Sequence, residues 1–227
     1  MIRLFFANMI TTWKSLWASK HFRMQFLLTF LLFASVIYFS SLYLSILEVR
    51  RGTVLLDPFL NRLPPKEYSL PIFCIVHSSL LISLILILLH PKAFLKALQG
   101  VSLLLILRTL TVYAVPLEPP IGMIYLQDPI TGFFLNNVNV VTKDLFFSGH
   151  VSVMCLLIYF SPDRYWRIYL TFVTPVLALL IMWQHVHYSV DVIAAPFFAL
   201  FCGKVIDKLN ERWAFGVDNI ELSRVNN

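Results

Sequence analysis

The sequence predicts an all-α membrane protein, a polytopic bundle of six transmembrane helices with both termini in the cytoplasm. Of its 227 residues, 59% are hydrophobic and only 13% are charged, about half the charged share of an average soluble domain. Several apolar runs also reach the roughly 18 residues that a helix needs to cross a bilayer core of about 30 Å. A third observation, the distribution of Lys and Arg, predicts the orientation.

The predicted spans lie at residues 24–47, 70–89, 96–116, 145–160, 165–183 and 188–206. They leave no room for a second soluble domain, so residues 24–207 are predicted to form one membrane domain. With the N-terminus in the cytoplasm, twelve of the 18 basic residues fall in cytoplasmic segments and five fall outside. This asymmetry is the positive-inside bias that fixes topology.

The segments that flank the spans are predicted to be cytoplasmic. Residues 1–23 carry apolar side chains at helical spacing, four basic residues and no acidic one, which is typical of an amphipathic helix lying in the membrane interface. No signal-peptide cleavage site is visible, and residues 208–227 are predicted to be a tail. The basic residues are scattered rather than gathered in a stripe, which disfavours nucleic-acid binding. The three cysteines (Cys74, Cys155 and Cys202) have no metal-type spacing and are predicted to be small core residues.

Two loops lie on the outer side in this topology. The first, about 48–69, contains prolines that exclude a regular helix. The second, about 117–144, is the longest connection between spans, and loops of this length are usually functional or disordered. Because it runs directly into Ser148, Gly149 and His150, we favour a functional loop.

A histidine and a carboxylate stand at the start of the last span. His187 and Asp191, in the stretch HVHYSVD, are four residues apart and would share one face of a helix. A carboxylate there can hold one imidazole nitrogen and leave the other free to attack or to move a proton. His185 is either part of this cluster or a residue that faces the outer water, and the sequence does not favour one over the other.

His150 is predicted to lie on the same side of the membrane as His187. The two are 37 positions apart, roughly two crossings of about 20 residues each, and two crossings return the chain to the face it left. Both would begin a helix, where unpaired N–H groups favour a phosphate. Ser148 and Gly149 fit such a site, since Ser can donate and Gly allows close approach.

Arg108 lies inside a predicted span, 96–116. Burying a charge there costs several kcal/mol unless it pairs or snorkels, so the residue is a functional candidate. Its distance from Lys96, roughly 18 Å at 1.5 Å per residue, places it in the outer half of the membrane, level with the histidines. A planar fork of donors suits phosphate, although a structural pair with a carboxylate is the alternative.

Ser148-Gly149-His150 followed by His187-x-x-x-Asp191 resembles the type 2 phosphatidic acid phosphatase superfamily of membrane lipid phosphatases and phosphotransferases. The closer likeness is to its sphingomyelin synthase and ceramide phosphoethanolamine synthase branch. That branch also has an Asp six residues before the first histidine, here Asp144, and its second motif HYTVD is similar to HYSVD here. The likeness covers about residues 57–206.

Two departures bear on the branch. The Lys-x6-Arg-Pro motif of the phosphatase branch is absent, and its Arg six residues before the second histidine is Ile181 here. The synthase branch commonly has Asp directly before that histidine, where this chain has Val186. The first departure favours a synthase over a simple phosphatase.

The resemblance implies the chemistry and the partners. His187, oriented by Asp191, would carry a phospho-head group taken from a glycerophospholipid donor, and His150 would act as acid and base. Arg108, Ser148 and Gly149 would bind the phosphoryl oxygens. Asp144, Glu118 and Asp128 are candidates for holding a cationic head group, and the alternative for each is a solvated loop acid. The acceptor would be a ceramide-like lipid alcohol, the site would face the non-cytoplasmic side, and no metal or cofactor is expected.

Other functions stay open. Water in place of the lipid acceptor would give a lipid phosphate phosphatase or a phospholipase C-type hydrolase. A non-enzymatic lipid-binding membrane protein could retain the fold, but the complete set of His150, His187 and Asp191 argues against it. A transporter would need broken helices near the bilayer midplane, for which only Pro175 and Pro196 are candidates.

Overall fold

Seven α-helices and one 3₁₀ turn, Leu60–Arg62, make up the computed structural model of the chain, which describes residues 2–127 and 141–225. Within these ranges the chain forms no β-strand, only an isolated bridge between Thr53 and Leu117. The predicted all-α class is therefore confirmed. The helices are α1 (Ile2–Ala18), α2 (Lys20–Leu47), α3 (Ser69–Leu88), α4 (Pro91–Ala114), α6 (Gly149–Phe160), α7 (Arg164–Trp183) and α8 (Ser189–Val225).

Five of these helices are long and apolar enough to cross a bilayer: Lys20–Tyr43, Ser69–Leu88, Pro91–Ala114, Arg164–Trp183 and Ser189–Arg212. They correspond to five of the six expected spans. The remaining one, expected at 145–160, corresponds to α6, whose 12 residues extend only about 18 Å at 1.5 Å per residue. The helix begins later than expected because the carbonyl groups of Asp144 and Phe147 bond to a side chain of α4 instead of entering a helix.

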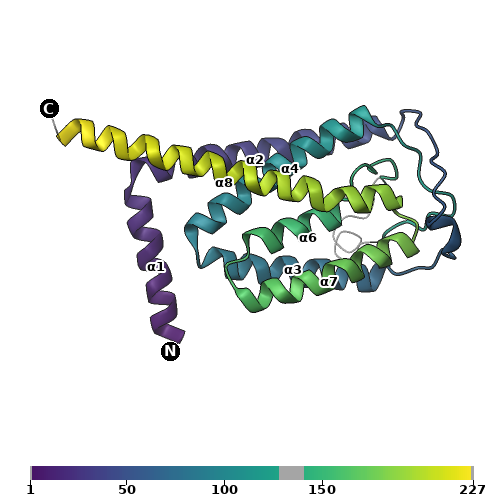
Figure 1. Cartoon of the computed structure of the whole chain (residues 1–227), viewed down its shortest axis with the longest axis horizontal. Coiled ribbons are helices and arrows are strands. Elements are labelled where there is room, and N and C mark those ends of the chain that lie inside the picture. The colour runs from purple at the N-terminus through teal and green to yellow at the C-terminus, as the bar shows by residue number, and fades with distance from the viewer. Residues whose placement is uncertain (1, 128–140, 226–227) are drawn as a thin grey trace.

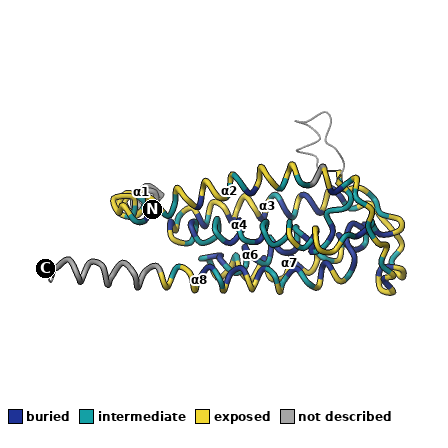
Figure 2. Tube along the Cα trace, turned by 90° about the horizontal axis from the view of Figure 1, so that it is seen from above, coloured by how far each residue is buried: buried dark blue, intermediate teal, exposed yellow. Residues whose placement is uncertain are grey.

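The short helix α6 lies in the middle of the bundle (Figure 1), with α8 on one side and α3 and α7 on the other. Its side chains Val151, Met154 and Leu156 are almost fully buried. Small residues on α8 allow close packing: Tyr159 lies where a Cβ on Gly203 would have to be. Burial concentrates around α6, whereas α2 shows an exposed outer face (Figure 2). The helix that starts at Gly149 is therefore the core of the protein.

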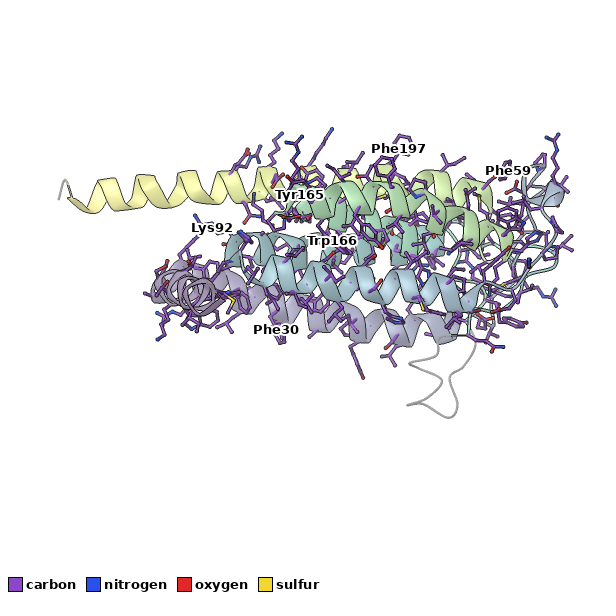
Figure 3. All side chains as sticks on the ribbon, turned by 90° about the horizontal axis from the view of Figure 1, so that it is seen from below. Phe30, Phe59, Lys92, Tyr165, Trp166 and Phe197 are labelled. Atoms are coloured by element: carbon purple, nitrogen blue, oxygen red, sulfur yellow. The ribbon has the colours of Figure 1, made fainter. Side chains whose placement is uncertain are left out.

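Large apolar side chains cover the outside of the bundle. Phe30 and Phe197 point outward from opposite faces (Figure 3) and are 56% and 69% exposed. A water-soluble protein rarely exposes apolar surface on this scale, so these side chains indicate contact with lipid and an integral membrane protein. Among the cysteines, Cys202 is buried and Cys155 partly buried, but Cys74 is exposed on this surface, so the core prediction was wrong for Cys74.

The first helix, α1, lies at a steep angle to the bundle and is seen end-on in Figure 2. Trp13 fixes it: its indole Nε1 donates to the Leu88 carbonyl at 2.8 Å, and its ring packs edge-on against Phe22, Phe26 and Phe94. A helix crossing one end of a bundle in this way has the geometry expected of an interfacial helix. At the other terminus, α8 continues without a break past residue 208, where the tail was expected to begin.

Candidate active site

The chain leading into α8 holds a buried histidine against a buried carboxylate. His187 Nδ1 lies 3.4 Å from Asp191 Oδ2, the long end of hydrogen-bond distances, and the Tyr188 amide donates to the same oxygen at 3.0 Å. The side chains of His187 and Asp191 are 4% and 0% exposed. Because Asp191 contacts Nδ1, the ring presents Nε2 for chemistry.

The starts of α6 and α8 are joined through their backbones. The amide of Ser148, the N-cap of α6, donates to the Asp191 carbonyl at 3.1 Å. His150 follows two residues later, half-buried, with the edge of the Phe73 ring against it at a centroid distance of 6.1 Å. The structure therefore brings both histidine motifs to one end of the bundle.

Two buried polar atoms at this junction have no hydrogen-bond partner among the described residues: the Ser148 hydroxyl and the second carboxylate oxygen of Asp191, Oδ1. Both residues are fully buried. Native proteins leave few such groups unpaired, and those that occur need an explanation such as a catalytic role. The Ser148 hydroxyl can donate to or accept from a polar ligand group at the helix starts, and Asp191 Oδ1 can accept from one.

Arg108 of α4 reaches the residues that precede α6. Its Nε donates to the Phe147 carbonyl and its Nη2 to the Asp144 carbonyl, both at 3.1 Å, and Nη2 lies 2.9 Å from Asp144 Oδ2. The guanidinium also occupies the space that a Cβ on Gly149 would take. Gly149 is therefore needed so that Arg108 can approach the start of α6, and Asp144 is the carboxylate that pairs with Arg108.

A pocket of about 260 Å³ opens beside His150 between α3, α4 and α6. Arg108, Gly149 and His150 line it with polar groups, and the rest of its lining is mainly apolar: Val76, Leu80, Leu104, Leu105, Val153 and Met154, with Ser152. A smaller pocket of about 60 Å³ lies on the other side of Arg108, against Asp144, Ser40 and Tyr43. A polar group can therefore reach Arg108 and His150 from an apolar cleft.

The outer loops carry carboxylates that are already engaged. Glu118 accepts from the Gly52 amide at 2.7 Å and lies 2.9 Å from Lys143 Nζ, and these two contacts lower the pKa of Glu118. Asp144 is likewise paired with Arg108. Asp128, the third candidate for binding a cationic head group, lies outside the described residues. Both described candidates therefore have a basic partner from the chain itself.

Asp57, in the first loop, was missed by sequence reasoning. One of its oxygens accepts from the amides of Phe59 and Leu60, and the other accepts from the amide and hydroxyl of Ser189 at 2.7 and 2.8 Å. Burial by itself raises the pKa of Asp57, but the amides of Leu60 and Ser189 outweigh it and lower the pKa. Asp57 thus caps the N-terminus of α8, and the only sequence signal for it was the Asp-Pro pair typical of a turn.

Gln184 and His185, between α7 and α8, connect both outer loops to this end of the bundle. The Gln184 side chain is fully buried, accepts from the Tyr68 amide at 2.9 Å and donates to the Ser69 hydroxyl at 2.8 Å. His185 is buried with its ring nitrogens near the carbonyls of Ile121 and Leu63. The alternative in which His185 faces water is therefore wrong. Gln184 stood out in the sequence only as a polar residue beside an apolar span.

No group of three His, Cys, Asp or Glu side chains that could hold a metal ion occurs in residues 2–127 and 141–225. The groups at the helix starts are a buried histidine with its carboxylate, and a second histidine and an arginine that are partly buried. This set can supply a nucleophile, an acid or base and a phosphate ligand.

Part of the chain resembles a known family. Residues 143–208 match the family model described as PAP2 superfamily C-terminal, a range that contains Asp144, His150, His187 and Asp191 but not Arg108. The match supports membership of the PAP2 superfamily and, with it, an activity of the lipid phosphatase or phosphotransferase type. Among curated proteins, none matches the chain.

Proposed function

We propose that this protein is a membrane lipid phosphotransferase that moves phosphocholine or phosphoethanolamine from a glycerophospholipid to a ceramide-like lipid alcohol. One observation carries the proposal: the buried His187–Asp191 pair is bonded, through Ser148, to the start of the helix that carries His150. A nucleophile with its orienting carboxylate next to a second histidine is the arrangement that a two-step transfer requires.

The first step forms a phosphohistidine. Nε2 of His187 attacks the phosphorus of the donor, and the phosphorus–oxygen bond to diacylglycerol breaks. His150 gives its proton to the departing oxygen, while the proton on Nδ1 of His187 stays facing Asp191. Atoms and charge balance, because the proton lost by His150 ends on the diacylglycerol hydroxyl.

The second step reverses these roles. His150 takes the proton of the acceptor's hydroxyl, the acceptor oxygen attacks the phosphorus, and the phosphorus–nitrogen bond to His187 breaks. Arg108, the Ser148 hydroxyl and the amides at the start of α6 would stabilise negative charge on the phosphoryl oxygens. The Arg108–Asp144 pair supports a role for Asp144 in orienting Arg108, in addition to the head-group contact that the resemblance implies.

The pocket beside His150 supports a lipid substrate. Its polar lining, Arg108 and His150, fits a phosphate, and its apolar lining from α3 and α4 fits the first part of an acyl chain. Water in place of the lipid acceptor would turn the same two steps into a hydrolase. The acceptor therefore has to be established by experiment.

The test uses the purified full-length protein in detergent with phosphatidylcholine or phosphatidylethanolamine labelled in the head group, with and without ceramide. Appearance of label in a ceramide product supports the transferase. Release of free phospho-head group or phosphate alone, with no product on ceramide, identifies a hydrolase and contradicts the transferase. No turnover with either donor, or unchanged turnover after His187→Ala, contradicts the chemistry and favours a non-enzymatic lipid-binding protein.

We also propose six spans with both termini in the cytoplasm and the histidine end of the bundle on the non-cytoplasmic side. The distribution of basic residues supports this orientation. A membrane-impermeant thiol reagent tests it on Ile121→Cys, in the second outer loop, and Lys92→Cys, at the opposite end of the bundle, in a Cys74→Ser background. Ile121 and Lys92 are both exposed. Labelling of position 121 from the cytoplasmic side would overturn the orientation.

A further inference from the structure

We infer that His185 is a positioning residue that, with both ring nitrogens protonated, ties the two outer loops to the turn that presents His187. The tie itself is independent of the proposed function, which enters only in the activity measurement below. His185 lies between α7 and α8, two residues before His187, and is 5% exposed.

The ring contacts are the first argument. Nδ1 lies 2.8 Å from the Ile121 carbonyl oxygen, in the second outer loop, and Nε2 lies 2.9 Å from the Leu63 carbonyl oxygen, in the first. A carbonyl oxygen can only accept a hydrogen bond, and a neutral imidazole has one N–H and one acceptor nitrogen. Both contacts are hydrogen bonds only when the ring is an imidazolium, which donates from both nitrogens.

The backbone at His185 is the second argument. The Val186 amide donates to the Ile181 carbonyl and the His185 amide to the Met182 carbonyl, the paired bonds of a Schellman motif that ends α7. His185 occupies the left-handed position of this motif, with a φ of +56°. Glycine is the usual residue there, and other side chains are uncommon at such angles. A histidine in this place pays a conformational cost that its two ring contacts offset.

The end of α7 is the third argument. The C-terminus of a helix carries a partial negative charge that favours a cation within the last turn, and His185 directly follows the C-cap Gln184. The charged or titratable groups within five residues of Leu63, Ile121 or His185 along the chain are Arg62, Lys66, Glu67, Tyr68, Glu118, Tyr125, His187 and Tyr188. No hydrogen bond or ion pair joins any of them to the His185 ring in the part of the chain that the structure describes. Carbonyl oxygens and the helix terminus are therefore what stabilise the charge.

The hydrogen bonds between His185 and the two loops should therefore depend on pH. The tie is complete while the ring carries both protons, and it loses one of its two hydrogen bonds as the pH rises and one nitrogen deprotonates. A lone pair then faces a carbonyl oxygen at under 3 Å, which is repulsive. The first and second outer loops should then become less firmly held against the turn that carries His187.

Hydrogen exchange of the full-length protein in detergent tests this directly. The variant is His185→Gly, because glycine favours a φ of +56° and keeps the Schellman turn while removing both N–H groups. His90→Asn, at the opposite end of the bundle, is the matched control that also removes a histidine. Amide exchange in residues 60–66 and 121–127 is measured at about pH 5.5 and pH 8, near the limits of the range in which histidine serves as a pH switch, and corrected for intrinsic rates.

In the wild type and in His90→Asn we expect exchange in both loops to be about tenfold slower at the lower pH, since hydrogen bonds to charged groups are the stronger ones. In His185→Gly exchange should be fast at both values, with α6 protected as in the wild type. Equal protection of the wild-type loops at the two pH values, or a pH dependence that survives in His185→Gly, would overturn the inference.

Activity gives a second readout. The rate of His185→Gly as a fraction of the wild-type rate at the same pH cancels any pH dependence that the two proteins share. This ratio should be lowest at acid pH and approach one as the pH rises; a ratio that does not change with pH would contradict a positioning role. If the wild type has no activity with the labelled lipids, the proposed function fails and the exchange measurement still decides the tie.

Discussion

At the end of the bundle that carries His150 and His187, buried side chains bond mainly to the backbone, whereas at the opposite end side chains bond to one another. Asp57, Gln184 and Arg108 all hold amide or carbonyl groups near the helix starts. At the other end, Lys96 and Tyr159 both lie 2.7 Å from the carboxylate of Asp207. Nearby, Asn210 of α8 bonds to Gln99 of α4 and Gln25 of α2.

We interpret the histidine end as the active site and the opposite end as a structural support. Hydrogen bonds to backbone groups hold the loops in place around the starts of α6 and α8. The polar side-chain atoms that these bonds do not use can then bind a ligand. Bonds between side chains of α2, α4, α6 and α8 fix only how the helices lie against each other. We therefore expect substitutions at the histidine end to change turnover and those at the opposite end to change stability.

The largest effect is expected from His187→Ala. Removing the nucleophile should lower turnover of the labelled donor lipid by about 10³-fold or more, as for catalytic residues that act as a unit. The thermal midpoint should also fall, because the ring is buried and its removal leaves a cavity, but the protein should stay folded at the assay temperature. Donor turnover and a melting curve on the same preparation measure both. His90→Ala, at the opposite end of the bundle, is the control and should keep both turnover and the thermal midpoint. Wild-type turnover in a folded His187→Ala protein would contradict the prediction.

Asp191→Asn should have the next largest effect. The amide oxygen can still accept from Tyr188, and the backbone bond from Ser148 is untouched, so the fold is kept. The ring of His187 loses the carboxylate that stabilises its charged form, and we expect kcat to fall by about 10²- to 10⁴-fold with KM nearly unchanged. Equal rates for the variant and the wild type would show that Asp191 only caps the helix.

Asp57→Asn is expected to lower stability, and its effect should depend on pH. The carboxylate accepts from four donors, and an amide nitrogen would face two of them as a second donor, which costs about 1–3 kcal/mol. Because the folded pKa of Asp57 is lowered, its stabilisation is present above the ordinary Asp value of about 3.9. It is lost as the pH falls through the lower folded value.

Thermal melting of the wild type and Asp57→Asn between about pH 3 and pH 7 measures this. The two midpoints should differ most at neutral pH and converge in acid. Glu211→Gln, an exposed carboxylate on α8, is the control and should follow the wild type. A gap between wild type and Asp57→Asn that stays constant down to pH 3 would show that the charge of Asp57 contributes nothing.

The sequence predicted the parts of this fold that are local in the chain. Long apolar runs predict helices whatever surrounds them, and the four-residue spacing of His187 and Asp191 predicts a shared helix face before any packing is known. The short helix α6 was predicted at the right place in the chain, but the predicted span began four residues too early, at 145 instead of 149. Hydropathy carries no information on the hydrogen bonds from Arg108 to the carbonyl groups of Asp144 and Phe147.

Contacts between distant segments were not predictable in the same way. Asp57 and Ser189 are far apart in the chain, as are His185 and Leu63, and no periodicity in a single sequence links them. Arg108 was recognised because a charge in an apolar span is costly, but its partner Asp144 was assigned a different role. Gly149 was expected to admit a ligand, whereas its missing side chain admits Arg108.

The smallest effect is expected from Lys96→Met at the opposite end of the bundle. The ion pair with Asp207 joins α4 to α8 at 2.7 Å, but both side chains are 35% exposed, and pairs with that access to solvent contribute about 0.2–1 kcal/mol. Methionine keeps most of the apolar length of lysine, so only the charge is removed, and Asp207 keeps its bond from Tyr159. The thermal midpoint should therefore fall by a few degrees at most, while kcat and KM for the donor lipid stay at wild-type values. A loss of turnover as large as that of Asp191→Asn, in a protein that still melts like the wild type, would contradict this expectation. It would mean that the two ends of the bundle are coupled and that the Asp207 end does more than hold the helices together.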